Sequence, residues 1–146
     1  MSIKTGMKTT NIKINNIPNT QPNGNWIGNA VPITNLNKGM YLCNVNLAIA
    51  SSGGAATMTY TIAVTTVLPW VDVNTNIIIS TPNTGNLTTS AILPVYQSCS
   101  NVCIIDVDNT PIYLMIQCNV NVGNWGTTIA APNQNNIISF TKIAPV

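Results

Sequence analysis

The chain has 146 residues and very little charge, with five lysines, three aspartates and no glutamate, arginine or histidine. Charged residues make up 5% of the sequence, against roughly 25% in an ordinary soluble domain. This composition excludes most enzyme chemistry, because it supplies no imidazole, no glutamate acid or base and no guanidinium group to hold a phosphoryl group.

Residues 1–25 are predicted to form an extended N-terminal arm, and residues 26–146 a single β-sandwich domain. One short strand is predicted in the arm, near Lys13–Ile17. The first residues lack the apolar segment of a signal peptide, so we expect synthesis in a cytosol without secretion. The arm could contact a neighbouring subunit or an acidic surface through its lysines, or it could be a solvated tail. These lysines are Lys4, Lys8 and Lys13.

The longest predicted strand follows a shorter one at Val31–Leu36. Over residues 40–50, apolar and polar residues alternate with period two, which is typical of a half-buried strand. Its buried face is predicted to carry Tyr41, Cys43, Val45, Leu47 and Ile49. A turn at residues 51–54 follows, and then a second alternating strand whose apolar face carries Met58, Tyr60, Ile62 and Val64. The two strands are predicted to form a hairpin.

The rest of the chain is also predicted to be strands and turns. A short apolar run at 77–79 precedes a predicted loop at 81–86, and candidate strands follow at 87–95 and 102–107. The next strand is predicted to bury Ile112, Leu114, Ile116, Cys118, Val120 and Val122. A loop at 123–126 and a last strand at 137–143 complete the chain.

These elements predict an all-β fold. About eight strands recur at roughly 10–12-residue spacing, which favours a single antiparallel jelly-roll β-sandwich over alternating strands and helices. No apolar run approaches the roughly 18 residues that a membrane-spanning helix needs.

The four cysteines are predicted to act as small buried apolar residues, because free cysteine is among the most buried residue types. A structural disulfide and a zinc site remain alternatives. The absence of a secretion signal favours reduced thiols, and the spacing of Cys99 and Cys103 differs from the usual zinc knuckle. The other two cysteines are Cys43 and Cys118.

Asp106 and Asp108 are predicted to belong to a turn with Asn109. A calcium site and a pair of catalytic carboxylates are the alternatives, although no glycine or glutamate completes a calcium-binding loop. Asn86-Leu87-Thr88 matches the N-glycosylation pattern, which we expect to be a chance match in a chain that is not secreted. We expect no catalytic residues, no cofactor and no metal.

The aromatic residues are predicted to be core or interface anchors, with sugar stacking as the alternative. They are Trp26, Trp70, Trp125, Tyr41, Tyr60, Tyr96 and Tyr113. A net charge of +2 is too small for a nucleic-acid-binding face, so nucleic acid is not expected as a main partner.

The segment from Ile33 to Leu42, with Gly39 and Tyr41 before an alternating strand, resembles a strand of the small trimeric jelly rolls of viral fibre heads and minor capsid proteins. Tumour-necrosis-factor-like domains share a similar strand. Pro111–Leu114 and the ending Ile138–Ala144 resemble the last two strands of such viral domains, although Lys142 stands where a larger basic residue is common. The resemblance implies that Gly39 permits the turn into the strand and that Tyr41 begins its buried face.

The resemblance implies a structural protein of a virion that contacts other capsid proteins. It also implies a homo-oligomer, most simply a homotrimer. We therefore expect a non-enzymatic minor capsid, penton or cement protein, located in the virion and synthesised in the host cytoplasm. The 23 Asn and the many Ile residues would suit an AT-rich genome, such as that of a large DNA virus. The alternative is a fibre-head or lectin-like attachment module that binds a receptor or a glycan.

Overall fold

A computed structural model describes residues 7–14, 20–28, 31–53, 56–67, 77–87, 95–127 and 136–145. In these ranges the chain forms strands and turns and no helix. The strands are β1 (Thr9–Lys13), β2 (Trp26–Gly28), β3 (Thr34–Leu36), β4 (Gly39–Ser51), β5 (Ala56–Thr65), β6 (Ile77–Leu87), β7 (Val95–Ile105), β8 (Thr110–Val120), β9 (Trp125–Gly126) and β10 (Ile137–Ala144).

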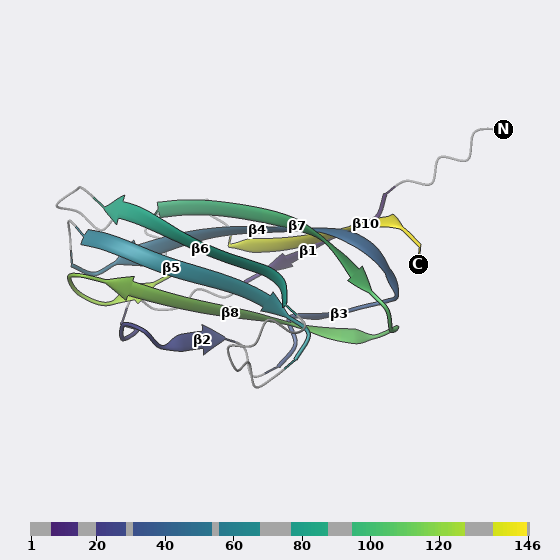
Figure 1. The fold of residues 1–146 in the computed structure, drawn as a ribbon, viewed down its shortest axis with the longest axis horizontal. Helices are drawn as coiled ribbons and strands as arrows, with labels where there is room; N and C mark the ends of the chain where they lie inside the picture. Colours follow the sequence, from purple (N-terminus) through teal and green to yellow (C-terminus); the bar gives the residue numbers. More distant parts are fainter. Residues whose placement is uncertain are drawn as a thin grey trace.

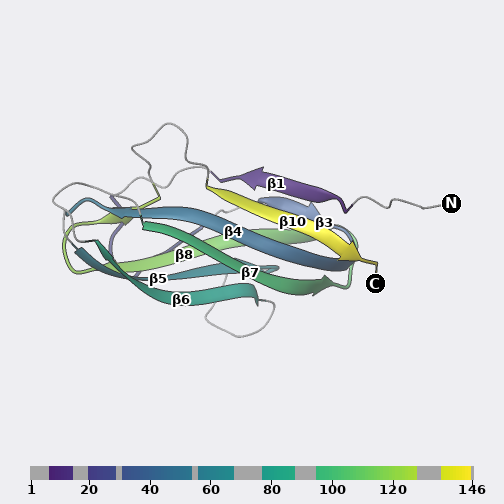
Figure 2. The same cartoon turned by 90° about the horizontal axis from the view of Figure 1, so that it is seen from above.

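The strands form two antiparallel sheets that face each other as a sandwich (Figure 1). One sheet has the order β1-β10-β4-β7, with β9 also paired to β4, and the other has the order β2-β8-β5-β6, with β3 also paired to β8. The first and last strands are neighbours, and Figure 2 shows β1 lying along β10 at one edge. The chain crosses between the sheets from β4 to β5, from β6 to β7 and from β7 to β8, which is the connectivity of a jelly roll. The prediction that β4 and β5 form a hairpin was therefore wrong: they lie in different sheets, and β5 pairs with β6 and β8 instead.

The core lies between the sheets and confirms the predicted alternation. Every second residue of β4 from Tyr41 to Ile49 is buried, as is every second residue of β5 from Met58 to Val64. The same holds for β8 from Ile112 to Val120. Side chains of a strand point alternately to its two faces, so one face of each strand supplies this core.

Three predictions about the extent of strands were wrong, the first because β7 begins at Val95 rather than at 102. For the strand expected near Lys13–Ile17, the structure describes β1 at Thr9–Lys13, and residues 15–17 lie outside the described residues. The loop expected at 81–86 is part of β6, which pairs with β5 over almost its whole length. Val122, expected in the core, is 45% exposed because β8 ends at Val120. The candidate strand at 87–95 lies mostly outside the described residues.

The prediction of a loop at 81–86 was wrong because β6 is an edge strand, where turn-forming residues are tolerated. Pro82 lies opposite Thr61 in the β5–β6 ladder, and a proline is tolerated in an edge strand because its missing N–H need not face a neighbouring strand. The residues Thr81 to Asn86 are typical of a turn, but here a long partner strand holds them in the sheet.

The loop expected at 123–126 contains β9, which pairs with the end of β4. Trp125 is 0% exposed, and its Nε1–H donates to Pro22 O at 3.0 Å. Gln21 and Trp125 also exchange two backbone hydrogen bonds. Residues of the predicted N-terminal arm therefore contact the sandwich of their own chain.

Candidate functional site

The β1-β10-β4-β7 sheet has an outer face that points away from the core, and we call it the outer sheet face. The register places one row of side chains from each strand on it. Among the described residues Lys13 is its one charged side chain. The members are Thr9, Asn11, Lys13, Ile137, Ser139, Thr141, Met40, Leu42, Asn44, Asn46, Ser98, Ser100, Val102 and Ile104.

The middle of the outer sheet face is polar but uncharged. Ser98 Oγ donates to Asn46 Oδ1 across the β4–β7 pair, and the Thr9 and Thr141 hydroxyls lie 2.9 Å apart across the β1–β10 pair. Asn46 and Ser98 also line a shallow depression of about 240 Å³, whose other lining residues include Asn44, Ser100 and Ser139. Amides and hydroxyls of this kind can both donate and accept hydrogen bonds to a neighbouring chain.

One end of the outer sheet face is apolar. Val102 and Ile104 on β7 are 50% and 56% exposed, and they lie opposite Leu42 and Met40 on β4. This strip was not among the sites predicted from the sequence. The signal that could have found it is the unbroken apolar run Val102 to Ile105, because such a run is typical of a strand covered on both faces.

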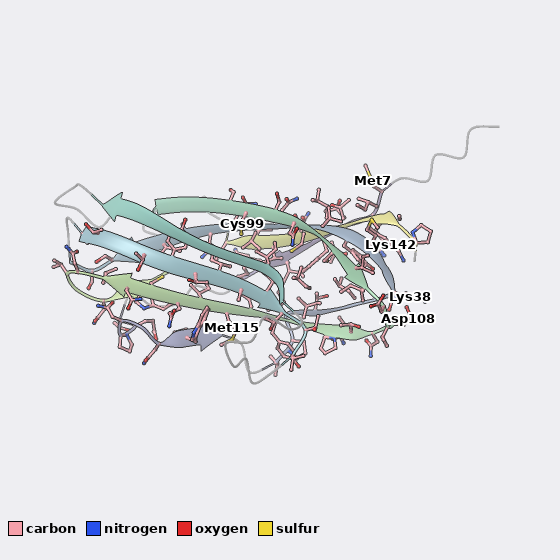
Figure 3. All side chains as sticks on the ribbon, in the orientation of Figure 1. Met7, Lys38, Cys99, Asp108, Met115 and Lys142 are labelled. Carbon is pink, nitrogen blue, oxygen red and sulfur yellow. The ribbon has the colours of Figure 1, made fainter. Side chains whose placement is uncertain are left out.

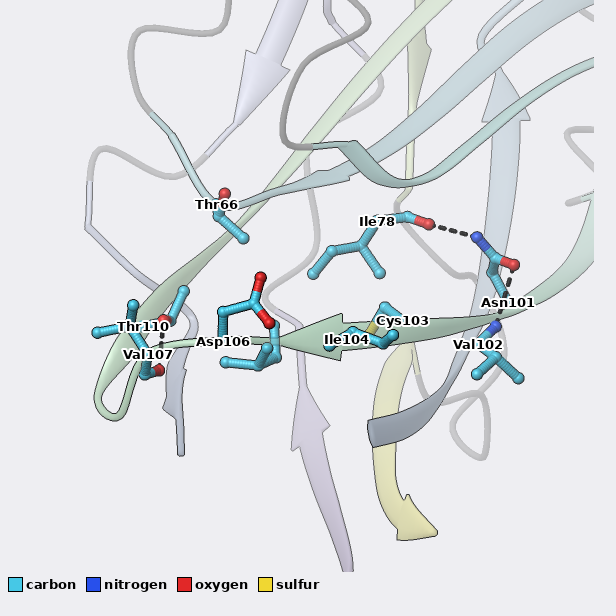
Figure 4. A pocket seen from close by; sticks show the side chains of 10 residues that line it. Thr66, Ile78, Asn101, Val102, Cys103, Ile104, Asp106, Val107 and Thr110 are labelled. Atoms are coloured by element: carbon cyan, nitrogen blue, oxygen red, sulfur yellow. Dashed lines mark hydrogen bonds between the residues drawn. The ribbon is translucent and has the colours of Figure 1, made fainter. Parts of the chain in front are cut away.

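A second hollow of about 390 Å³ lies along the free edge of β7 (Figure 4). Asn101 lies at one end of it: its Nδ2–H donates to Ile78 O at 2.6 Å, and its Oδ1 accepts Val102 N–H at 3.0 Å. Asn101 thereby links the edges of the two sheets and satisfies a backbone donor that an edge strand would otherwise expose.

The hollow at β7 does not contain a recognisable catalytic set. Its titratable lining residues, among those described, are Asp106 and Cys103, and burial raises the pKa of the Cys103 thiol. A single carboxylate and a thiol held in its neutral form do not make an activated nucleophile with a base.

The prediction that Cys43 and Cys118 occupy the core is confirmed. Both are 0% exposed, Cys103 is 9% exposed, and Cys99 is half-buried. All four are thiols rather than disulfides, and no group of metal-ligating side chains suited to a metal ion was found among the described residues. Burial, with smaller effects of Cys103 and Cys99, raises the pKa of the Cys43 thiol to about 12, and burial also raises the pKa of Cys118.

These environments predict the order of thiol reactivity. At pH 8 we expect Cys99 to react first with a water-soluble disulfide reagent, while Cys43 and Cys118 react only on unfolding, because they are buried and little thiolate forms. Cys99→Ser should abolish the fast phase. Fast labelling of Cys43 or Cys118 in the native protein, located by mass spectrometry of peptides, would contradict this prediction.

The same pKa shifts predict a loss of stability in alkali. A folded-state thiol pKa above the unfolded value contributes stability that is complete below the unfolded pKa and is lost as the pH rises towards the folded pKa. For Cys43 this interval runs from the ordinary value of 9.0 to about 12. Urea unfolding at increasing pH should show a smaller decline in Cys43→Ala than in the parent chain, measured relative to each protein at pH 7.

The predicted turn is confirmed for Asp108 and Asn109, whereas Asp106 precedes the turn. Residues 106–109 connect β7 to β8, and Asp108 Oδ1 accepts Lys38 N–H at 2.8 Å. Asn109 adopts a φ of 61°, a left-handed conformation that asparagine tolerates better than most residues. Figure 3 shows Asp108 beside Lys38 at the end of the sandwich.

The prediction that aromatic residues anchor the core holds for three of them. Trp125, Tyr60 and Tyr41 are 0%, 3% and 7% exposed, whereas Trp26 and Tyr113 are half-buried. Trp70 lies outside the described residues, as do the side chain of Tyr96 and the end of the Asn86-Leu87-Thr88 sequence. Within the described ranges there is no helix that could cross a bilayer.

Comparison with known proteins supports the fold. No protein-family model matches the sequence, and no curated protein matches it. Among solved structures, the chain is similar to an Eiger TNF from S. frugiperda, with a TM-score of 0.51 and 11% identity over 96% of this chain and 94% of that one. The predicted jelly-roll β-sandwich is therefore confirmed, and at this identity the similarity extends to the fold alone.

Proposed function

We propose that this chain is a non-enzymatic structural protein of a virion, a minor capsid, penton or cement component, that assembles as a homotrimer. The observation that carries the proposal is the outer sheet face, which is almost uncharged and ends in an exposed apolar strip. The resemblance of the β4 segment to strands of trimeric viral jelly rolls supports both the setting and the trimer.

The scarcity of charge on this surface favours assembly. A surface designed to stay free in solution carries about 25–35% charged residues, and charge of one sign keeps copies apart. The outer sheet face has one described lysine among its fourteen positions. A surface of this kind resembles the interior of a permanent interface, where charged residues are depleted.

The apolar strip gives the proposed interface its strongest contacts. Val102 and Ile104 are half exposed and lie side by side with the partly buried Leu42 and Met40. Contiguous exposed apolar surface marks sites of protein contact, and its burial contributes about 25 cal/mol per Å². A closed ring of three subunits buries this strip once in every copy.

The test is the native mass of the full chain and of a variant with charge in the strip. We expect the parent chain to have three times the 15.5 kDa mass of a monomer in light scattering. Val102→Glu/Ile104→Glu should be monomeric, because two carboxylates in each copy would be buried without partners. Circular dichroism should show an unchanged β-sheet spectrum, since both side chains are exposed in the monomer.

Val31→Glu is the matched control, because Val31 is 69% exposed but lies outside the outer sheet face. It should leave the trimer intact. A parent chain that is monomeric at all concentrations, or a charged variant that remains trimeric, would contradict the proposed interface. A trimer that binds glycans and is absent from particles would instead support the attachment-module alternative.

A further inference from the structure

Two lysines lie opposite each other on the inner side of the sandwich, where a β-sandwich normally places apolar residues. Thr9 pairs with Thr141 and Lys142 pairs with Tyr41. Lys8 continues the β1 register opposite Lys142, and its C=O accepts Lys142 N–H at 3.1 Å. Side chains of directly opposite residues lie on the same face, and like charges in that arrangement repel each other.

The two lysines line one pocket of about 290 Å³ at the end of the sandwich. The pocket takes its other residues from β1, from the β3–β4 segment and from β4. None of its lining residues, among those described, is acidic. They are Lys8, Thr10, Asn35, Leu36, Asn37, Tyr41 and Lys142.

Lys142 is held in position by its neighbours. Its Nζ donates to Lys38 O at 2.8 Å and lies 5.9 Å from the centre of the Tyr41 ring. A Cβ on Gly39 would lie 2.5 Å from Lys142 Cε, so the absence of a side chain there leaves room for the lysine. An ammonium has three donors, and the contact with Lys38 uses one of them.

Other residues that line the pocket carry further donors. Asn37 lines the pocket and carries an Nδ2 amide donor, while its Oδ1 accepts Asn109 N–H at 3.3 Å. Asn35 adds a second amide and Thr10 a hydroxyl. Tyr41 Oη donates to Asn37 O at 2.9 Å and thereby ties the pocket floor to the β3–β4 segment.

We propose that this pocket binds an oxyanion, either a free sulfate or phosphate or the sulfate or carboxylate group of a small saccharide. An oxyanion between Lys8 and Lys142 would neutralise their repulsion and accept charge-assisted hydrogen bonds from both ammonium groups and from the amides. The volume is near the lower end of the roughly 300–1,000 Å³ range of small-molecule sites, which suits a ligand of about one sugar ring. The pocket lies on the inner side of the sheet, so the proposal does not depend on the proposed trimer.

Isothermal titration calorimetry of the full chain at low ionic strength tests the proposal. The probes are sodium sulfate, sodium phosphate, a sulfated heparin disaccharide and sialyllactose, with lactose as the uncharged control. We expect saturable binding of at least one anion and none of lactose. If an anionic saccharide binds about tenfold or more tightly than the inorganic anions, the sugar is also recognised; if not, the site is one for free oxyanions.

Two variants remove the charges, and a third is the matched control. Lys8→Gln and Lys142→Met should each weaken binding about tenfold, by loss of a charge-assisted contact. Lys13→Gln removes a lysine from the same strand, but from its outer side, and should change the affinity less than about twofold. Because Lys8 is exposed, Lys8→Gln keeps the test valid even if Lys142→Met does not fold.

Thermal unfolding gives a second measurement. Sulfate raises the unfolding temperature of proteins in general, because it is excluded from their surface. Binding at the pocket is therefore indicated only by the part of this increase that the parent chain and Lys13→Gln show and that Lys8→Gln does not. The proposal is overturned if no anion binds saturably to the parent chain. It is equally overturned if all three lysine variants bind as the parent does, or if Lys13→Gln loses as much affinity as Lys8→Gln.

Discussion

Replacing Trp125 with alanine is expected to lower the free energy of unfolding by about 3–5 kcal/mol, the usual cost of truncating a buried tryptophan. The indole is 0% exposed and belongs to the main core. Its Nε1–H donates to Pro22 O at 3.0 Å, and the substitution would leave that carbonyl without its donor as well as leaving a cavity. Urea unfolding followed by circular dichroism measures the loss.

Two further variants separate the contributions at this position. Trp125→Phe retains most of the apolar volume but not the Nε1–H donor, so its cost should lie well below that of Trp125→Ala. Trp26→Ala, at a half-buried tryptophan of the other sheet, is the control for loss of any tryptophan and should cost less than Trp125→Ala. An equal loss in both alanine variants would show that β9 does not anchor the core.

The second large effect is expected at Asn136, which is 1% exposed. Its Oδ1 accepts Ala48 N–H at 2.9 Å, and its Nδ2–H donates to Thr127 O at 3.0 Å. Asn136→Leu would leave both backbone groups buried without these partners, at about 1–3 kcal/mol for each group. The unfolding free energy in urea should fall accordingly, and Asn11→Leu, at an exposed position on β1, should change it little.

Asn136→Asp adds a pH dependence that identifies the cause. A carboxylate would still accept Ala48 N–H, but it would be buried facing Thr127 O without a proton to donate. Burial would raise the pKa of this carboxyl above its unfolded value, so stability is highest below the unfolded pKa and is lost as the pH rises through the folded pKa. The destabilisation relative to the parent should therefore be smaller at pH 4 than at pH 7. Asn11→Asp should not show this trend.

The two proposals place different functions on the two sides of one sheet. The outer sheet face, with its amides, hydroxyls and apolar strip, suits contact between subunits. The inner side ends in the pocket that contains Lys8 and Lys142. Variants at Val102 and Ile104 therefore test assembly without changing the pocket, and variants at the two lysines test anion binding without changing the outer sheet face.

The sequence alone determined the class of fold and the character of the surface. Alternation with period two is a local property, so β4, β5 and β8 could be predicted together with the residues that they bury. The replacement of charge by asparagine and threonine at outward positions, such as Asn44 and Thr59, could also be seen in the sequence. Burial of Cys43 and Cys118 followed from the same alternation.

Tertiary structure alone decided which segments pair and which side chains meet. The polar residues of β6 form a strand because β5 lies beside them, and β9 is a strand because the end of β4 extends to it. Lys8 and Lys142 are 134 positions apart in the chain but lie opposite each other because β1 pairs with β10. Pairing between distant strands depends on register and on closure of the sandwich, and no local pattern in the sequence records either of them.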